Sequence, residues 1–197
     1  MKAISCIILT IMVSINMTGK EKAKATFGGG CFWCTEAFFD ALEGVEKVES
    51  GYSGGHTDNP SYKEICTGLT GHAEVVQITY DPNVIEFVDL LEVFFATHDP
   101  TTLNRQGGDV GTQYRSVVFY HSQEQKETTE MVIETLEKEK VFNNPVVTEV
   151  SAIGKFYEAE NYHQDYFANN PKQPYCNVVI NPKLKKFRKM FAEKLKD

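Results

Sequence analysis

The chain has 197 residues, of which 42% are hydrophobic and 24% are charged. These fractions are typical of a soluble globular protein, and they exclude a disordered chain, a collagen-like repeat and a bundle of membrane helices. The length suits one domain with a full hydrophobic core. The formal net charge of −7 argues against a general nucleic-acid binder, because such proteins present basic surfaces to phosphates. We therefore expect a monomer that binds no nucleic acid.

The N-terminal segment differs in composition from the rest of the chain. Residues 3–18 are uncharged and apolar, follow Lys2 and precede a polar stretch, and they are too few to cross a bilayer, which takes about 20 residues. This pattern resembles a secretory signal peptide, and residues 23–25 have the Ala-x-Ala form of a cleavage site. We expect residues 1–20 to direct export to the periplasm or cell envelope and residues 21–197 to form one domain. The alternative is a cytoplasmic protein with a buried N-terminal strand or helix.

The first half of the chain alternates short apolar runs with glycine-rich turns, which predicts strands separated by helices and loops. Proline directly after Asp81 is typical of the first turn of a helix, and the apolar residues that follow recur at helical spacing. In chain order we expect a strand at 26–30, a helix at 31–42, a strand at 45–52, a loop at 53–60, a strand at 74–80 and a helix from 81 to about 98.

The second half contains more irregular chain. Ser122 and Gln125 have the spacing of a capping box, which predicts the start of a polar helix. In chain order we expect a loop at 101–113, a strand at 114–120, a helix at 122–140, a strand at 146–153, a short helix at 159–167, an irregular stretch at 169–177 and a basic amphipathic helix at 183–197. The order β-α-β-β-α-β predicts an α+β fold, a two-layer sandwich with a ferredoxin-like core and long irregular loops.

Cys31 follows three glycines and opens the first expected helix. Unpaired N–H groups and the helix dipole stabilise a thiolate at such a position, so we expect the pKa of this thiol to lie below its free value of about 8.5. The glycines allow a ligand to approach the backbone closely. Phe32 and Trp33 add apolar surface beside the sulfur. The pattern favours a reactive thiol over a buried structural cysteine.

Glu74 opens the clearest predicted strand. Period-2 alternation places it with Val76, Ile78 and Tyr80 on the more apolar face. A carboxyl group buried there would have a raised pKa, which suits a general acid near neutral pH. The alternative is a glutamate at the strand end that turns toward solvent.

Two other site chemistries use the same cysteines. Cys31 and Cys34 have the Cys-x-x-Cys spacing of thiol–disulfide oxidoreductases. A zinc module would need two further ligands, and the chain offers no second closely spaced pair, so we expect no metal. The candidates for those two further ligands are Cys66, Cys176 and His72. Apart from this zinc alternative, we interpret Cys66 as structural.

Seven sequence blocks together resemble the signature of the peptide methionine sulfoxide reductase A family. They occur in the family's order and extend the resemblance from about residue 24 to 182. The blocks are GCFWCTE at 30–36, GYSGG at 51–55, PSY at 60–62, TGHAEV at 70–75, HDPT at 98–101, DVGTQYRS at 109–116 and ENYHQ at 160–164.

The resemblance implies an enzyme that reduces methionine S-sulfoxide, free or in oxidised proteins, to methionine. In the family's mechanism, Cys31 would attack the sulfoxide sulfur and Glu74 would protonate the sulfoxide oxygen. The hydroxyls of Tyr62 and Tyr114 would assist. Asp109 would act through a bound water or by orienting the polar site. A sulfoxide needs such a soft nucleophile and such an acid on chemical grounds as well.

The resemblance also implies how the substrate is held and how the enzyme is recycled. Phe32 and Trp33 would enclose the ε-methyl group of the substrate. Attack would leave a sulfenic acid on Cys31, which a second thiol converts to a disulfide. The family usually keeps this resolving thiol near the C-terminus, which favours Cys176, with Cys34 as the alternative. Thioredoxin or a similar dithiol protein would reopen the disulfide, and we expect no other cofactor.

Overall fold

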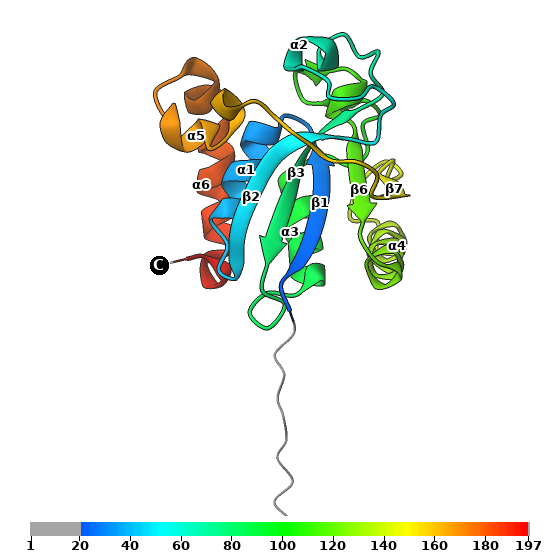
Figure 1. Ribbon diagram of the computed structural model, residues 1–197. Helices are drawn as coiled ribbons and strands as arrows, with labels where there is room; N and C mark the ends of the chain where they lie inside the picture. Colours follow the sequence, from blue (N-terminus) through cyan, green and yellow to red (C-terminus); the bar gives the residue numbers. More distant parts are fainter. Residues whose placement is uncertain (1–20, 197) are drawn as a thin grey trace, which may run out of the picture.

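The computed structural model describes residues 21–196, so the predicted targeting segment at 1–20 lies outside the described residues. A six-stranded sheet in the order β7-β6-β1-β3-β2-β8 forms the centre of the molecule (Figure 1). All neighbours pair antiparallel except β6 and β7, which are parallel. The strands are β1 (Ala23–Gly29), β2 (Val45–Ser53), β3 (Ala73–Tyr80), β6 (Ser116–Tyr120), β7 (Glu149–Ala152) and β8 (Tyr157–Glu158), and a separate two-stranded ribbon pairs β4 (Arg105–Gln106) with β5 (Asp109–Val110).

The longer helices form one layer against this sheet (Figure 1). The opposite face carries a small apolar cluster of Ala73, Val75, Val117 and Phe119, packed against the loop residues Ile153 and Phe156. The predicted two-layer α+β sandwich is therefore confirmed. The helices are α1 (Phe32–Asp40), α2 (Tyr62–Ile65), α3 (Phe87–Thr97), α4 (Gln123–Lys138), α5 (Tyr166–Asn169) and α6 (Asn181–Met190).

Aromatic packing fixes α1 against the sheet. Phe27 of β1 is fully buried, and its ring stacks on Phe39 of α1 and Phe94 of α3 with centroid distances of 5.3 and 5.0 Å. Such pairs add about 1 kcal/mol each beyond the burial of their surface. The start of α1 is therefore held at the end of β1, above the edge where β3 begins.

The helix predicted from Asp81 begins later, at Phe87. The carbonyl of Asp81 accepts hydrogen bonds from the N–H groups of Val84 and Ile85, which close a single turn. Extended backbone at Glu86 then ends that turn, and Glu86 and Asp89 form the capping box that starts α3. Val84, one of the apolar residues at helical spacing after Asp81, consequently lies outside α3 and is 56% exposed.

The helices of the C-terminal region have other bounds than the sequence predicts, and the expected helix at 183–197 begins at Asn181 and ends at Met190. The expected helix at 159–167 is divided into a 3-10 turn (Asn161–His163) and α5. A π-helical turn (Cys176–Ile180) continues directly into α6, so Cys176 lies at the start of a helix and not in an irregular stretch. Leu184, Phe187 and Phe191 of the basic helix are buried, as the amphipathic pattern predicts.

Candidate active site

The turn between β1 and α1 presents Cys31 at the end of the sheet. Gly30 has a φ of 94°, and a side chain there would place its Cβ 2.6 Å from Gln106, so only glycine fits. Cys31 is the N-cap residue of α1 and is half-buried. Its sulfur therefore lies at the helix N-terminus, as the sequence predicts, but in a largely enclosed position.

Glu74 lies directly beside this turn. Its side chain is 1% exposed, and its Oε2 accepts the N–H of Phe32 at 3.2 Å. Burial raises the pKa of the carboxyl to about 8, and the nearby Asp109 adds to the effect. The interpretation of a solvent-facing glutamate is therefore wrong, and Glu74 holds a proton at neutral pH.

The expectation of a lowered pKa for Cys31 is wrong. A hydrogen bond with Cys34, burial and the neighbouring Glu74 carboxyl raise the pKa of the Cys31 thiol well above its ordinary value, and the N–H of Trp33 opposes them only in part. The same thiol–thiol hydrogen bond lowers the pKa of Cys34. The effect of the helix start is real, but the acidic and apolar surroundings outweigh it.

Tyr175 connects the thiols to Asp109. Its hydroxyl donates to Oδ2 of Asp109 at 2.9 Å and lies 3.9 Å from Sγ of Cys34. No sequence pattern predicts a role for Tyr175, and its position directly before Cys176 is the one signal that points to it. Cys176 itself is fully buried in the core under α1, in the same apolar cluster as Cys34.

Tyr62 and Tyr114 both border Glu74. Burial, and then the Glu74 carboxyl, raise the pKa of each phenol far above its ordinary value, so both hydroxyls keep their protons. Tyr62 begins α2, and Tyr114 lies in a 3-10 turn (Thr112–Tyr114) and not in the predicted strand. Two neutral O–H donors therefore accompany the protonated carboxyl.

The two aromatic residues after Cys31 differ in exposure. Phe32 is 1% exposed and packs against Tyr52 and His163, whereas Trp33 is half-buried. The indole N–H of Trp33 donates to Nδ1 of His163 at 3.1 Å, and its ring stacks on Tyr166 at 3.7 Å. Trp33 is thus the more accessible apolar surface near the thiol.

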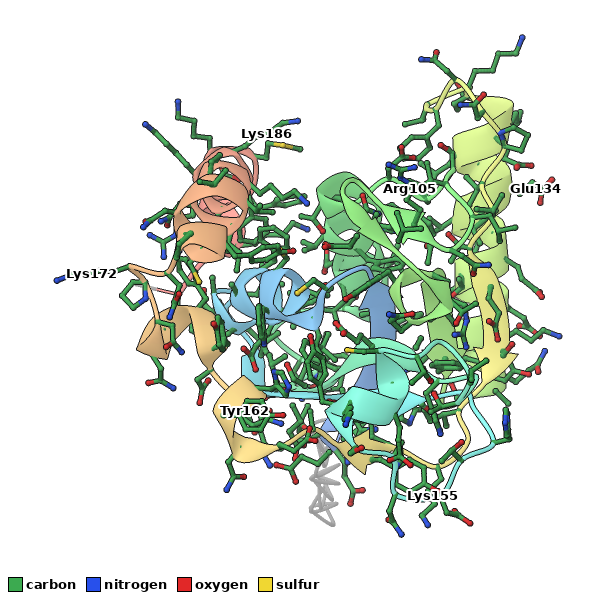
Figure 2. All side chains as sticks on the ribbon, turned by 90° about the horizontal axis from the view of Figure 1, so that it is seen from above. Arg105, Glu134, Lys155, Tyr162, Lys172 and Lys186 are labelled. Atoms are coloured by element: carbon green, nitrogen blue, oxygen red, sulfur yellow. The ribbon has the colours of Figure 1, made fainter. Side chains whose placement is uncertain are left out.

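The 160–166 segment joins the elements of this region. A carboxylate oxygen of Glu160 accepts the N–H of Tyr62 at 2.8 Å. The amide of Gln164 bonds both the N–H and the C=O of Ser50 on β2. Figure 2 looks down on this end of the molecule and shows the segment, with Tyr162 labelled, beside the start of α1. No pattern within the segment predicts these contacts, because their partners lie about 100 residues away along the chain.

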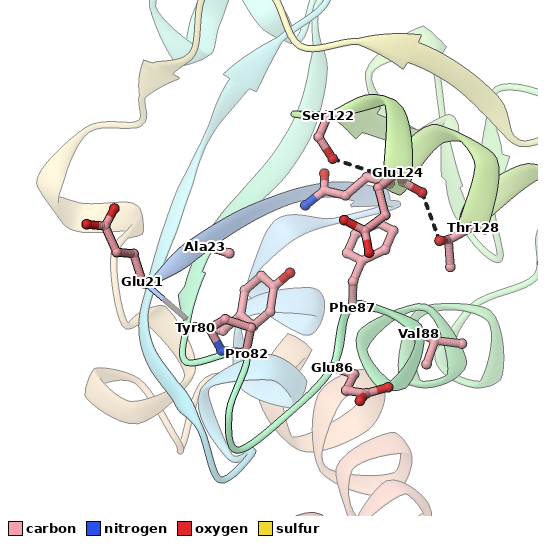
Figure 3. A pocket seen from close by; sticks show the side chains of 11 residues that line it. Glu21, Ala23, Tyr80, Pro82, Glu86, Phe87, Val88, Ser122, Glu124 and Thr128 are labelled. Carbon is pink, nitrogen blue, oxygen red and sulfur yellow. Dashed lines mark hydrogen bonds between the residues drawn. The ribbon is translucent and has the colours of Figure 1, made fainter. Parts of the chain in front are cut away.

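A cavity of about 470 Å³ lies elsewhere, between the starts of α3 and α4 (Figure 3). None of the predicted site residues lines it. Within residues 21–196, no three His, Cys, Asp or Glu side chains are grouped to hold a metal ion. No helix in this part of the chain has the length and apolar character to span a membrane.

Comparison with known proteins identifies the family. The family described as Peptide methionine sulfoxide reductase matches residues 23–195. The chain is 55% identical over 174 residues to "Peptide methionine sulfoxide reductase MsrA" of Chromobacterium violaceum, which covers 88% of this chain and 99% of the relative. The chain belongs to the peptide methionine sulfoxide reductase family. The family, fold and reaction that the sequence predicts are therefore confirmed, and this reductase converts methionine sulfoxide to methionine.

Solved structures agree with this assignment. Reduced Mxr1 of Saccharomyces cerevisiae superposes with a TM-score of 0.72 at 37% identity, over 81% of this reductase and 94% of Mxr1. A crystal structure of Mxr1 in complex with Trx2 is also similar, with a TM-score of 0.51 at 26% identity over 74% of this chain and 85% of that chain. The fold of the reductase is thus that of characterised members of the family.

Proposed function

We propose that Cys31 and Glu74 carry out the reduction of methionine S-sulfoxide in this reductase. The observation that supports this most is a protonated, buried carboxyl beside a thiol at a helix start. The sulfur of Cys31 attacks the sulfoxide sulfur while Glu74 donates its proton to the sulfoxide oxygen. Oxygen transfers to Cys31 with the proton that Glu74 donated, and methionine leaves. The proton that the Cys31 thiol loses passes to the Glu74 carboxylate, so Glu74 is protonated again at the end of the step.

The raised pKa of Cys31 supports a substrate-triggered attack. Because the thiol is protonated in the free enzyme, it loses its proton only as the sulfoxide oxygen accepts one. The neutral hydroxyls of Tyr62 and Tyr114 stabilise the polarised oxygen. Asp109 acts through Tyr175, whose hydroxyl it orients. The Trp33 ring, with Phe32 behind it, forms the apolar wall against the ε-methyl group.

A stereospecific assay tests the proposed reaction. The reduced enzyme is mixed with separated S- and R-sulfoxides of a methionyl peptide, without an external reductant. We expect the S isomer to give about one methionine per enzyme within the first turnover and the R isomer to give none. The proposed pocket has hydrogen-bond donors for the sulfoxide oxygen in one place and an apolar wall for the methyl group in another, so only one isomer can satisfy both. Equal yields from both isomers would contradict the proposed site.

The resolving thiol is proposed to be Cys34. The sequence favours Cys176, on the expectation that it lies in a turn-rich segment able to move toward Cys31. Cys176 is instead fully buried at the start of a helix, and reaching Cys31 would require that helical turn to unfold. The thiols of Cys34 and Cys31 lie close enough for each to shift the pKa of the other, and three-residue spacing across a helix start is within disulfide reach. These observations support the alternative over the sequence-based preference.

Peptide mapping after one equivalent of sulfoxide shows which of the two candidates, Cys34 or Cys176, is the resolving thiol. We expect a Cys31–Cys34 disulfide as the dominant product. Cys34→Ser should still release about one methionine per enzyme and then accumulate sulfenic acid, while Cys176→Ser should continue to turn over with thioredoxin. A dominant Cys31–Cys176 bridge in the wild-type protein would restore Cys176 as the resolving thiol.

The external reductant is proposed to be thioredoxin or a related dithiol protein. The structural similarity to Mxr1 in complex with Trx2 supports this. In a Cys31–Cys34 disulfide the half-buried Cys31 sulfur would be the more exposed end, where the thiolate of the reductant could attack. The reductant attacks one sulfur, forms a mixed disulfide and leaves both thiols of the enzyme reduced.

Residues 1–20 are proposed to direct export, and residues 21–197 to form the single catalytic domain. The family match begins only at residue 23, and the Chromobacterium relative is covered over 99% of its length by 88% of this chain. The apolar stretch at 3–18 therefore precedes the conserved domain. Protein purified from its native cells should lack about 20 N-terminal residues or sediment with the envelope. Intact Met1 on protein from the cytosolic fraction would establish the cytoplasmic alternative.

A further inference from the structure

Glu36 is a buried carboxylate that the proposed chemistry does not use. It follows Trp33 by three residues on α1 and is 3% exposed. Its Oε1 accepts the hydroxyl of Ser50 and the N–H of Asp165, each at 3.0 Å, and its Oε2 accepts the N–H of Tyr166 at 3.1 Å. Burial raises the pKa of this carboxyl to about 7, and the three donors directed at it oppose that rise, because they favour the ionised form, which only accepts hydrogen bonds. Glu36 thus ties the helix that carries the thiol to the end of the 160–166 segment.

The backbone that Glu36 holds is in an unfavourable conformation. Asp165 has a φ of 51°, in the left-handed region, although its side chain is exposed. Non-glycine residues adopt this conformation rarely, although aspartate does so more readily than most, and the hydrogen bond from the Asp165 N–H to Glu36 helps to hold it here. The two N–H groups bound by Glu36 follow one another at this point. The carboxylate therefore sets the direction in which the chain enters α5.

That direction determines where Tyr166 lies. Its ring is parallel to the Trp33 indole, with an interplanar angle of 7° and a centroid distance of 3.7 Å. His163, from the same segment, accepts the indole N–H through Nδ1. Its Nε2 is buried and has no hydrogen-bond partner among the described residues, which leaves Trp33 as the ring's polar contact. The 160–166 segment thus holds the Trp33 indole by a hydrogen bond at its N–H edge and by stacking on one face of its ring.

We propose that Glu36 is a positioning residue for substrate recognition, acting through Tyr166 and His163 to hold the Trp33 indole as the wall of the methyl site. This rests on the proposed role of Trp33. The indole is half-buried, so it is free to change rotamer when its two supports move. A preorganised wall spares the substrate the cost of ordering it on binding. Loss of Glu36 therefore weakens binding and leaves the reacting groups in place.

Glu36→Gln tests the proposal, because the amide keeps the shape but offers one acceptor oxygen where two are used. Trp33 is the only tryptophan in the chain, so its fluorescence reports on this indole alone. We expect emission at longer wavelength and stronger quenching by acrylamide in the substrate-free enzyme. We also expect the KM for a methionyl sulfoxide peptide to rise about tenfold, with the saturated single-turnover rate within about twofold of wild type.

A double-mutant cycle with Tyr166→Leu shows whether Glu36 acts through the stacked ring. Tyr166→Leu should raise KM and shift the Trp33 emission by itself. The double variant should then bind substrate no worse than Tyr166→Leu alone, since both changes remove the same support. Additive KM effects would overturn the proposal. If E36Q does not fold, the Tyr166→Leu variant tests the proposal by itself. A wild-type KM or wild-type Trp33 fluorescence in that variant would then overturn the proposal.

Asp89→Asn is the control for a merely structural effect. The Asp89 carboxylate lies in the first turn of α3, accepts the backbone N–H of Glu86 and forms an ion pair with Lys194. The control should lower Tm without changing Trp33 emission or KM. Unchanged emission and KM in E36Q would refute the proposal. Because emission is read without substrate, failure of the proposed reaction would leave that measurement intact, and the two failures are distinguishable.

Discussion

Replacement of Cys31 by serine is expected to abolish methionine sulfoxide reduction. A hydroxyl is a far weaker nucleophile toward sulfur, and it cannot form the sulfenic acid or the disulfide that recycling requires. We expect single-turnover methionine release to fall by at least about 1,000-fold. Quenched-flow measurement of methionine formed from the S-sulfoxide, without reductant, isolates this step from recycling.

Cys66→Ser is the matched control for this substitution. Cys66, interpreted from the sequence as structural, is an exposed free thiol at the end of α2. Its replacement removes one thiol from the protein and leaves Cys31, Cys34 and Cys176 in place. Methionine release by Cys66→Ser should stay near the wild-type rate. Turnover by Cys31→Ser above a residual level would remove Cys31 from the mechanism.

Replacement of Glu74 by glutamine is expected to slow the chemical step by about 100-fold or more, the usual loss on removing a general acid. The amide keeps the shape and can still accept the Phe32 N–H, but it has no proton to give. In the wild-type enzyme the acid form is lost as pH rises through about 8, so the single-turnover rate should fall above that pH. In Glu74→Gln this fall should be absent. A persistent fall would assign the acid to another group.

The same substitution should stabilise the protein at alkaline pH. In the unfolded chain the carboxyl ionises above its ordinary pKa of 4.5, whereas in the folded protein it keeps its proton up to about 8. The unfolded state therefore binds fewer protons between these values, and the free energy of unfolding decreases as pH rises through this window. Each pH unit contributes about 1.4 kcal/mol, so the total over this window is on the order of 5 kcal/mol.

Thermal unfolding as a function of pH measures this effect. Glu74→Gln should have a Tm several degrees above wild type at pH 8, since about 1 kcal/mol shifts Tm by roughly 2–4 °C in a protein of this size. About one pH unit below the ordinary pKa of 4.5 the two proteins should unfold at similar temperatures, because the wild-type carboxyl is then neutral in the folded state and largely so in the unfolded state. A lower Tm for Glu74→Gln at pH 8 would contradict the raised pKa of this carboxyl. If Glu74→Gln is more stable than the wild type and also slower, Glu74 lowers the stability of the folded protein and serves the reaction instead.

The sequence by itself determined the order of the elements, the two-layer fold, and the positions of Cys31 and Glu74. Hydrophobic periodicity and turn residues act over a few neighbours, so they are readable without the fold. The alternation placed Glu74 on an apolar row and so predicted its burial and raised pKa, but it left a solvent-facing glutamate open until the structure showed the side chain buried. Local signals failed at Asp81, where a single closed turn, and not the proline, decided the helix start.

Only the tertiary structure decided the protonation of Cys31, the burial of Cys176 and the contacts of Glu36. The pKa of the Cys31 thiol depends on Glu74, which lies 43 positions away, and the carboxylate of Glu36 bonds N–H groups about 130 positions away. Electrostatic and hydrogen-bond energies depend on distance in space and on exclusion of water, and neither is encoded in local sequence pattern. The sequence thus determined which residues can react, and their packing determined when each holds its proton.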